Sequence, residues 1–160
     1  MAWRGLIGAS AALLVAIGGP AAAVDETWNL QRLDDLSFWD AASLKRDGDG
    51  VTYREVRVIQ DFNAYGAGTM TVGHIVLVMT YGVSCSSRLR TPTTGVAVYD
   101  AKGRLKQSAG AAQGGQAAVL GREDPMSKVL DGVCGDTPVE PPAGLTSIKA
   151  AVADVARRGN

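Results

Sequence analysis

Histidine and cysteine are scarce in this sequence of 160 residues, which contains one His and two Cys. A zinc site needs three or four nitrogen, sulfur or carboxylate ligands, and a serine or cysteine nucleophile usually needs a neighbouring base. The chain therefore offers little material for metal or nucleophile chemistry. We expect a protein that is not an enzyme, with no catalytic residues, no metal site and no cofactor.

The chain also lacks an excess of charge, because 16 Lys and Arg are balanced by 16 Asp and Glu, and only 6% of its residues are aromatic. Nucleic-acid binding draws on cations for the phosphates and aromatic rings for stacking, so this composition argues against it. A hydrophobic fraction of 46% with 20% charged residues excludes a disordered chain and fits one globular domain.

Residues 1–23 have the pattern of a secretory signal peptide. Arg4 supplies the positive charge, 6–17 form the apolar stretch, and 21–23 are an Ala-Ala-Ala cleavage site. The alternative is an uncleaved membrane anchor, but a span needs about 20 apolar residues, and the Gly-Gly-Pro at 18–20 ends the stretch sooner. No Cys stands at the expected cleavage site to accept a lipid anchor. We expect a cleaved signal, a periplasmic or extracellular protein and no membrane span in the mature chain.

The two cysteines, Cys85 and Cys134, both follow the expected cleavage site. An even pair in an oxidising compartment most simply forms one disulfide, and only one pairing exists here. A redox pair would favour a C-x-x-C spacing, which the sequence does not contain. We expect a structural disulfide.

Short apolar steps predict strands near 28–33 and 37–39, followed by a helical turn at 40–44. Asp47-Gly48-Asp49-Gly50 predicts a turn before a strand over 51–62. The apolar alternation in that strand changes phase between Tyr53 and Val56. Either a β-bulge or burial of both faces accounts for the change.

The apolar, β-branched run at 74–83 predicts a central strand that continues through 85–90 and is interrupted at 91–94. A hairpin follows, with strands at 96–99 and 104–108 around a turn at 100–103. We expect an exposed loop at 63–73 and find no defensible pattern at 109–121.

Asp124 and Pro125 predict the cap and first residue of a helix that ends near Gly135, so the disulfide would join this helix to the sheet. A Pro-rich linker at 136–145 precedes a C-terminal helix at 146–160. That helix either docks on the domain, which we favour, or binds a partner.

The order of these pieces resembles the bacterial surface-adhesin protein E family, small exported domains of Gram-negative bacteria. The family pattern runs from a Trp-led strand through an aromatic-Asp-x-x-Ser-Leu segment, a Gly turn, a Val strand, a Cys-basic strand and a Tyr-Asp hairpin to a helix ending in Val-Cys. The matching residues here are Trp28, 39–44, 47–50, 51–59, 84–90, 98–105 and 129–134.

The resemblance implies an α+β fold over 24–135, with a helix packed on one face of an antiparallel β-sheet and tied to it by the disulfide. It implies no catalytic residues. Two features depart from the family. Gly121-Arg122-Glu123 stands where a Trp often precedes the last helix, and the lipid-acceptor Cys of surface-anchored members is missing.

Four motifs that hint at chemistry each have a simpler interpretation. An EF-hand loop aligned on Gly50 would begin at Lys45 and end at Val56, neither of which is acidic, so we favour a turn at 45–50. Residues 82–86 match only half of a G-x-S-x-G nucleophile elbow. His74 is the only His and lies on an apolar strand. We therefore favour a structural role for it over binding a metal or a haem or acting as a catalytic base. Asp34, Asp35 and Asp40 come nearest to the paired carboxylates of a glycosidase. However, the adjacent Asp34 and Asp35 would face opposite ways in a strand.

Basic side chains recur at alternate positions, which predicts that Arg88 and Arg90 share one face of their strand, as do Lys102, Arg104 and Lys106. The functional interpretation is a surface for an acidic partner or glycan. The simpler interpretation, a solvated face of a one-sided sheet, is favoured.

From the sequence we expect an exported binding module of the Gram-negative envelope that recognises a protein or an envelope component. It would act through the sheet face or the loop at 63–73. The alternatives are a small periplasmic enzyme or enzyme inhibitor, and a small-ligand carrier using His74. An enzyme predicts a concave pocket with convergent polar groups, whereas a binding module predicts none. The edge of an open sheet could also pair into a homodimer.

Overall fold

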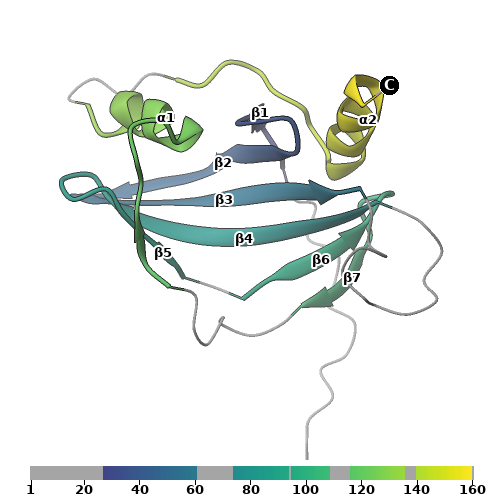
Figure 1. Cartoon of the computed structure of the whole chain (residues 1–160), viewed down its shortest axis with the longest axis horizontal. Coiled ribbons are helices and arrows are strands. Elements are labelled where there is room, and N and C mark those ends of the chain that lie inside the picture. The colour runs from purple at the N-terminus through teal and green to yellow at the C-terminus, as the bar shows by residue number, and fades with distance from the viewer. Residues whose placement is uncertain (1–26, 61–73, 94, 109–115, 136–139, 160) are drawn as a thin grey trace, which may run out of the picture.

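The computed structural model describes residues 27–60, 74–93, 95–108, 116–135 and 140–159 (Figure 1). The expected signal peptide at 1–23, the loop at 63–73 and the linker residues 136–139 lie outside this part of the chain. Among the described residues, no helix is long and apolar enough to cross a membrane.

The described chain forms an antiparallel β-sheet and two α-helices, which confirms the coarse fold prediction. The strand order is β1-β2-β3-β4-β5-β8, and β6 pairs with β4 and β7. The elements are β1 (Leu30–Arg32), β2 (Ser37–Asp47), β3 (Gly50–Ile59), β4 (Ile75–Ser84), β5 (Leu89–Pro92), β6 (Ala97–Asp100), β7 (Leu105–Ser108), β8 (Ala118–Val119), α1 (Pro125–Val133) and α2 (Ile148–Arg158).

The helical turn predicted at 40–44 is wrong, because β2 runs through these residues. Its register against β3 shifts between Asp40 and Lys45, so the extra residues form an irregular bulge. Ser43 fills the gap in the ladder. Its Oγ accepts a hydrogen bond from the Arg54 N–H at 2.8 Å and donates one to the Asp40 carbonyl at 2.7 Å. Pairing with β3 thereby overrides the local helical tendency of the Ala-Ala-Ser segment.

The phase change in β3 comes from burial of both faces of the strand. The register between β3 and β4 is continuous from the Gly50 pair to the Ile59 pair, so β3 has no bulge against β4. Val51 and Tyr53 belong to one apolar cluster with residues of α1. Val56 and Val58 point to the opposite face and belong to a second cluster with residues of α2.

Strand β4 does not continue to Arg90 as predicted. Residues 85–87 form a turn, and Arg88 follows it with a φ of 58°. The Cys85 N–H donates to the Asp49 carbonyl at 2.8 Å, which fixes this turn beside the β2–β3 turn. The chain then returns along β4 as β5, which includes Pro92 at its last position, where the missing N–H is tolerated.

The hairpin and both helices form where the sequence predicts them. Asp124 caps α1 by accepting a hydrogen bond from the Met126 N–H at 2.8 Å, and Ser147 caps α2 in the same way through Ala150 at 3.1 Å. Cys85 and Cys134 form the predicted disulfide. Figure 1 shows α1 and α2 over opposite ends of the long strands.

The C-terminal helix shares a core with the sheet, as docking requires. Its buried side chains join one cluster with these sheet-side residues: Trp28, Leu30, Phe38, Val56, Val58, Val76 and Val78. The helix residues in that cluster are Ile148, Ala151, Val152 and Val155.

Candidate functional site

The five predicted basic residues lie at two separate places. Arg90 pairs with Val83 near the end of β4, whereas Asp100, at the start of the hairpin turn, pairs with Ile75 at the beginning of β4. Strand positions that far apart are separated by about 26 Å, at ~3.3 Å per residue. The structure therefore does not bring the two predicted groups together.

Arg88 and Arg90 are engaged within the fold. Arg88 contacts Asp131 of α1 at 2.5 Å, and Arg90 contacts Glu55 at 3.3 Å. The Arg90 guanidinium also lies over the ring of Tyr81, 4.7 Å from its centre. Because Arg88 lies outside β5, the strand alternation that predicted a shared face for the two arginines does not apply.

The other three basic residues surround Asp100 at the tip of the β6–β7 hairpin. The Asp100 carboxylate accepts hydrogen bonds from the Arg104 N–H at 3.0 Å and the Lys102 N–H at 2.9 Å. The side chains of Arg104, at 2.7 Å, and Lys106, at 3.4 Å, contact the same carboxylate. Led by the Arg104 N–H, these contacts hold the pKa of Asp100 well below its ordinary range.

The hairpin tip lies against the first turn of α2. A Cβ added at Gly103 would meet the Cβ of Ile148 at 3.7 Å and the backbone nitrogen of Lys149 at 3.9 Å. Lys149, Ala153 and Arg157 then follow at four-residue spacing, and all three are exposed. The cations of the hairpin thus continue along the outer face of α2.

A second carboxylate, Asp154, lies beneath the end of this helical face. It contacts Arg32 of β1, Arg157 at 3.3 Å and Arg158 at 3.7 Å. The hydrogen bond from Arg32 is the main cause that lowers the pKa of Asp154 below its ordinary 3.8. The Asp154 carboxylate thus lies among these three cations and is largely shielded from solvent.

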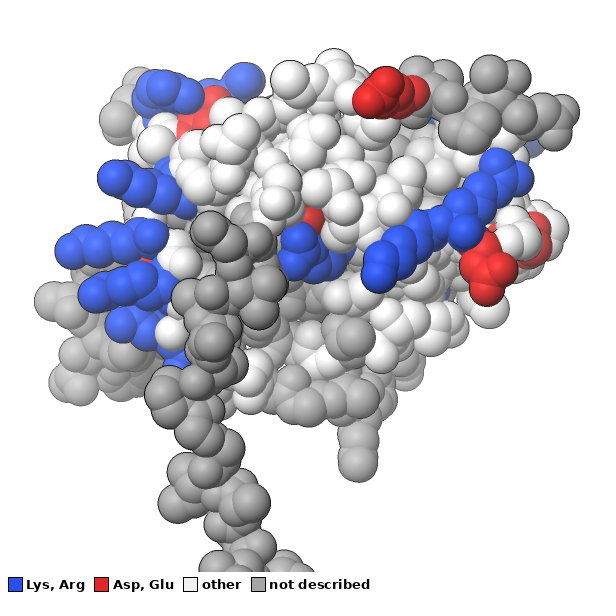
Figure 2. Space-filling view, turned by 180° about the vertical axis from the view of Figure 1, so that it is seen from behind, with Lys and Arg blue, Asp and Glu red and all other residues white. Residues whose placement is uncertain are grey.

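Six exposed cations at this end of the molecule form a surface that we call the basic surface: Lys102, Arg104, Lys106, Lys149, Arg157 and Arg158. The side chains of Arg104, Lys106, Arg157 and Arg158 are 54–72% exposed, whereas those of Asp100 and Asp154 are only 20% and 16% exposed. Figure 2 shows Lys and Arg gathered along the side of the molecule that carries α2. The surface therefore presents positive charge although the whole chain is neutral.

The half-matched nucleophile elbow is a structural serine cluster. The hydroxyls of Ser84 and Ser86 donate to Asp49 at 2.7 and 2.9 Å, and these bonds lower the pKa of Asp49. Cys85 lies in the disulfide. His74 precedes β4, at the opposite end of that strand from Ser84, so the described geometry assembles no Ser-His pair.

Two of the acidic candidates have structural partners. Asp40 is completely buried and accepts hydrogen bonds from Arg54 at 2.6 and 3.0 Å and from the Asn29 N–H at 2.9 Å. Asp34 accepts from the N–H groups of Leu36 and Ser37 and shapes the turn before β2. Across the described ranges, no group of three or more His, Cys, Asp or Glu could hold a metal ion.

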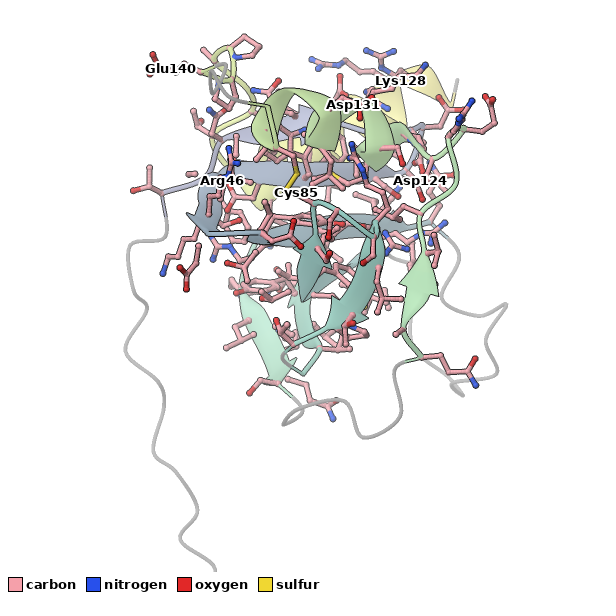
Figure 3. All side chains as sticks on the ribbon, turned by 90° about the vertical axis from the view of Figure 1, so that its left-hand side faces the viewer. Arg46, Cys85, Asp124, Lys128, Asp131 and Glu140 are labelled. Carbon is pink, nitrogen blue, oxygen red and sulfur yellow. A yellow bond between two sulfur atoms is a disulfide. The ribbon has the colours of Figure 1, made fainter. Side chains whose placement is uncertain are left out.

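Arg46 has a structural role that the sequence pattern did not reveal. Its guanidinium donates to the carbonyls of Val133, Cys134 and Gly135 at 2.9–3.3 Å, where the C-terminal carbonyls of α1 lack helical partners. Figure 3 shows Arg46 and Cys85 near the same end of this helix. The only sequence clue is a cation on a strand that leads into the Asp47–Gly50 turn, which does not identify a distant helix end.

The fold also contains a polar recess of about 150 Å³ that sequence reasoning missed. It is bordered by the turn before β2, by β3 and β5, and by the start of α1, and its charged lining residues are Asp34, Glu55, Arg57, Arg90 and Asp124. Burial raises the pKa of Glu55, against the opposing effect of Arg90. The nearby Tyr53 hydroxyl is buried, and burial raises the pKa of Tyr53 to about 12 against the opposing effect of Arg90.

A larger groove of about 350 Å³ separates α1 from the segment that leads to α2. Trp39 and Val129 supply apolar lining, Pro141 and Pro142 form the other wall, and Lys128 lies at the rim.

Comparison with protein-family models gives no match for this chain. Comparisons with curated proteins and with solved structures also give none.

Proposed function

We propose that the chain is an exported, non-catalytic binding module of the Gram-negative envelope that recognises an acidic protein or envelope component through the basic surface. The observation that carries this proposal is the unequal exposure of charge at the α2 end. Cations at the hairpin and on α2 project into solvent, while Asp100 and Asp154 lie beneath them. Such an arrangement attracts anions without requiring a net positive chain.

Export is part of the proposal, and two features support it. The segment at 1–23 has the order of charge, apolar stretch and small residues that signal peptides share. The Cys85–Cys134 disulfide is a bond that persists in oxidising compartments. We place the mature protein in the periplasm or at the cell surface.

The proposed architecture follows the adhesin E-like interpretation of the sequence. In it, α1 packs on one face of the sheet and the disulfide holds it there. Support comes from the cluster that Met126, Leu130 and Val133 form with Tyr53 and Val83. A homodimer through the sheet edge remains part of the hypothesis.

The polar recess is the feature that favours the second candidate, a small periplasmic enzyme. It contains a buried carboxyl beside guanidinium groups, the kind of convergence that catalysis requires. Its lining includes no Cys, Lys or His and only one hydroxyl, that of Ser37. We therefore favour binding over catalysis.

Binding to two polyanions tests the proposal: poly-L-glutamate as an acidic polypeptide, and phosphatidylglycerol vesicles as an anionic membrane. We expect at least one to bind at low salt and the affinity to fall as salt rises, because screening weakens exposed charge contacts. Phosphatidylcholine vesicles supply the uncharged control. Absence of binding to both polyanions would contradict the proposal.

A pair of triple variants locates the binding surface. Lys102→Gln/Lys106→Gln/Lys149→Gln removes three cations from the basic surface. Lys45→Gln/Arg122→Gln/Lys128→Gln removes three exposed cations elsewhere, so both variants carry the same net charge. We expect the first to weaken binding roughly tenfold or more and the second to change it little. Equal losses would mean that net charge, rather than this surface, controls binding.

Protease treatment of intact and lysed cells tests the location. Loss of the protein from intact cells would place it at the surface, whereas protection until lysis would place it in the periplasm. Protection that persists after lysis of the outer membrane alone would contradict export.

A further inference from the structure

The polar recess differs from the basic surface because charges of both signs line it. Its polar lining consists of Asp34, Ser37, Glu55, Arg57, Arg90 and Asp124. A volume of about 150 Å³ has room for about five water-sized groups, at ~30 Å³ each. The recess is therefore large enough for a small polar molecule.

The inner charges of the recess satisfy each other. The Arg90 guanidinium lies 3.3 Å from Glu55, whose side chain is only 10% exposed. The opposite charges of this pair make that wall of the recess largely neutral. Burial of the Glu55 carboxyl is the main cause of its raised pKa. A ligand needs no net charge to compensate this wall.

The outer charged groups of the recess could still form ion pairs and accept hydrogen bonds. Arg57 is exposed and forms no ion pair with any residue that the structure describes. Asp34 and Asp124 each use Oδ1 to accept backbone hydrogen bonds, and Oδ2 of each accepts none from the described residues. The recess thus offers one cation and two carboxylate oxygens.

Sheet pairing places these groups near one another. Arg57 is the cross-strand partner of Ser37, and the Ser37 N–H donates to Asp34 at 2.7 Å. Asp124 enters from the other side, as the cap of α1. A bound molecule would therefore meet positive charge on β3 and negative charge from two flanking turns.

We propose that this recess binds a small zwitterion of the α-amino acid class. Its carboxylate pairs with Arg57, and its ammonium group is received by the free oxygens of Asp34 and Asp124. A simple anion would meet uncompensated carboxylates, and a simple cation would leave Arg57 unpaired. This site shares no residue with the basic surface.

Calorimetric titration of the full protein with each of the twenty standard L-amino acids tests the proposal. We expect at least one to bind, and its carboxamide and its N-acetyl form, each of which lacks one charge, to bind at least roughly tenfold more weakly. Absence of binding by all twenty, or equal binding of the blocked forms, would overturn the proposal.

Two variants connect binding to the recess. Arg57→Gln alters an exposed side chain, and Asp34→Asn keeps an oxygen that can still accept the Leu36 and Ser37 N–H bonds, so the fold should persist in both. We expect each to weaken amino-acid binding roughly tenfold. Lys45→Gln, on the neighbouring strand, is the control and should bind as the unmodified protein does. Unchanged binding in both recess variants would overturn the assignment, whatever poly-L-glutamate does at the basic surface.

Discussion

The two helices are held at opposite ends of the same strands by different means. The disulfide and the Arg46 hydrogen bonds fix the C-terminal end of α1, and Asp124 caps its start. Helix α2 buries an apolar face, as α1 does, and is linked to β1 by the ion pair between Arg32 and Asp154. The α1 end is therefore fixed by covalent and polar links, whereas the outer face of α2 remains available to display cations.

Removing the disulfide should produce the largest difference between the two ends. For a loop closed by residues 49 positions apart, the chain-entropy relation gives about 4 kcal/mol. We expect Cys85→Ala/Cys134→Ala to lose about this free energy of unfolding in urea titrations, with α1 amides losing more protection from hydrogen exchange than α2 amides. Equal loss at both helices would break the comparison.

Truncation of one buried side chain in each helix sharpens the contrast. Leu130→Ala in α1 and Ile148→Ala in α2 both remove completely or nearly completely buried apolar volume, which costs about 3 kcal/mol. In hydrogen exchange, we expect α2 to lose protection locally in Ile148→Ala, whereas the disulfide keeps α1 near the sheet in Leu130→Ala. A more fully opened α1 than α2 would contradict this difference.

Loss of the Arg46 contacts should have a smaller effect. Arg46→Met leaves three carbonyls at the end of α1 without their side-chain donor, and we expect a loss of about 1 kcal/mol. The control is Arg157→Met, whose surface ion pair contributes at most about 0.5 kcal/mol. Thermal or urea unfolding of the two variants measures the difference, and equal stabilities would deny Arg46 a capping role.

Acid should destabilise α2 before α1, and we expect this loss of stability to be the smallest of the four predicted effects. The pKa of Asp154 is lowered in the fold, chiefly by Arg32, so its contribution to stability is present above the ordinary pKa of 3.8 and is lost as the pH falls through the lower folded value. We expect α2 amides to exchange faster, relative to α1 amides, at pH 3 than at pH 5. Asp154→Asn should remove this pH dependence, and its persistence would assign it to another group.

Local patterns in the sequence predicted much of the fold. The Asp124-Pro125 cap, the hairpin around 100–103 and the cysteine pair each depend on a few neighbouring residues or on a single possible partner. The helical turn at 40–44 was wrong because its outcome depends on Arg54, on another strand, which bonds to Ser43. Sheet pairing overrode local propensity there.

The candidate sites were less accessible to prediction for the same reason. Alternation along a strand could not foresee the turn at 85–87 that leaves Arg88 outside β5, or the placement of Gly103 against Lys149 of a distant helix. The polar recess joins residues of β3, β5 and two turns, and no sequence spacing encodes that convergence.

Mapping amide chemical shifts during titration with poly-L-glutamate tests most directly the claim that the α2 end is the binding end. We expect the largest shifts in the hairpin at 100–106 and along Lys149, Ala153 and Arg157, with little change at α1. Shifts centred on α1, or spread evenly over both ends, would contradict the assignment of the basic surface.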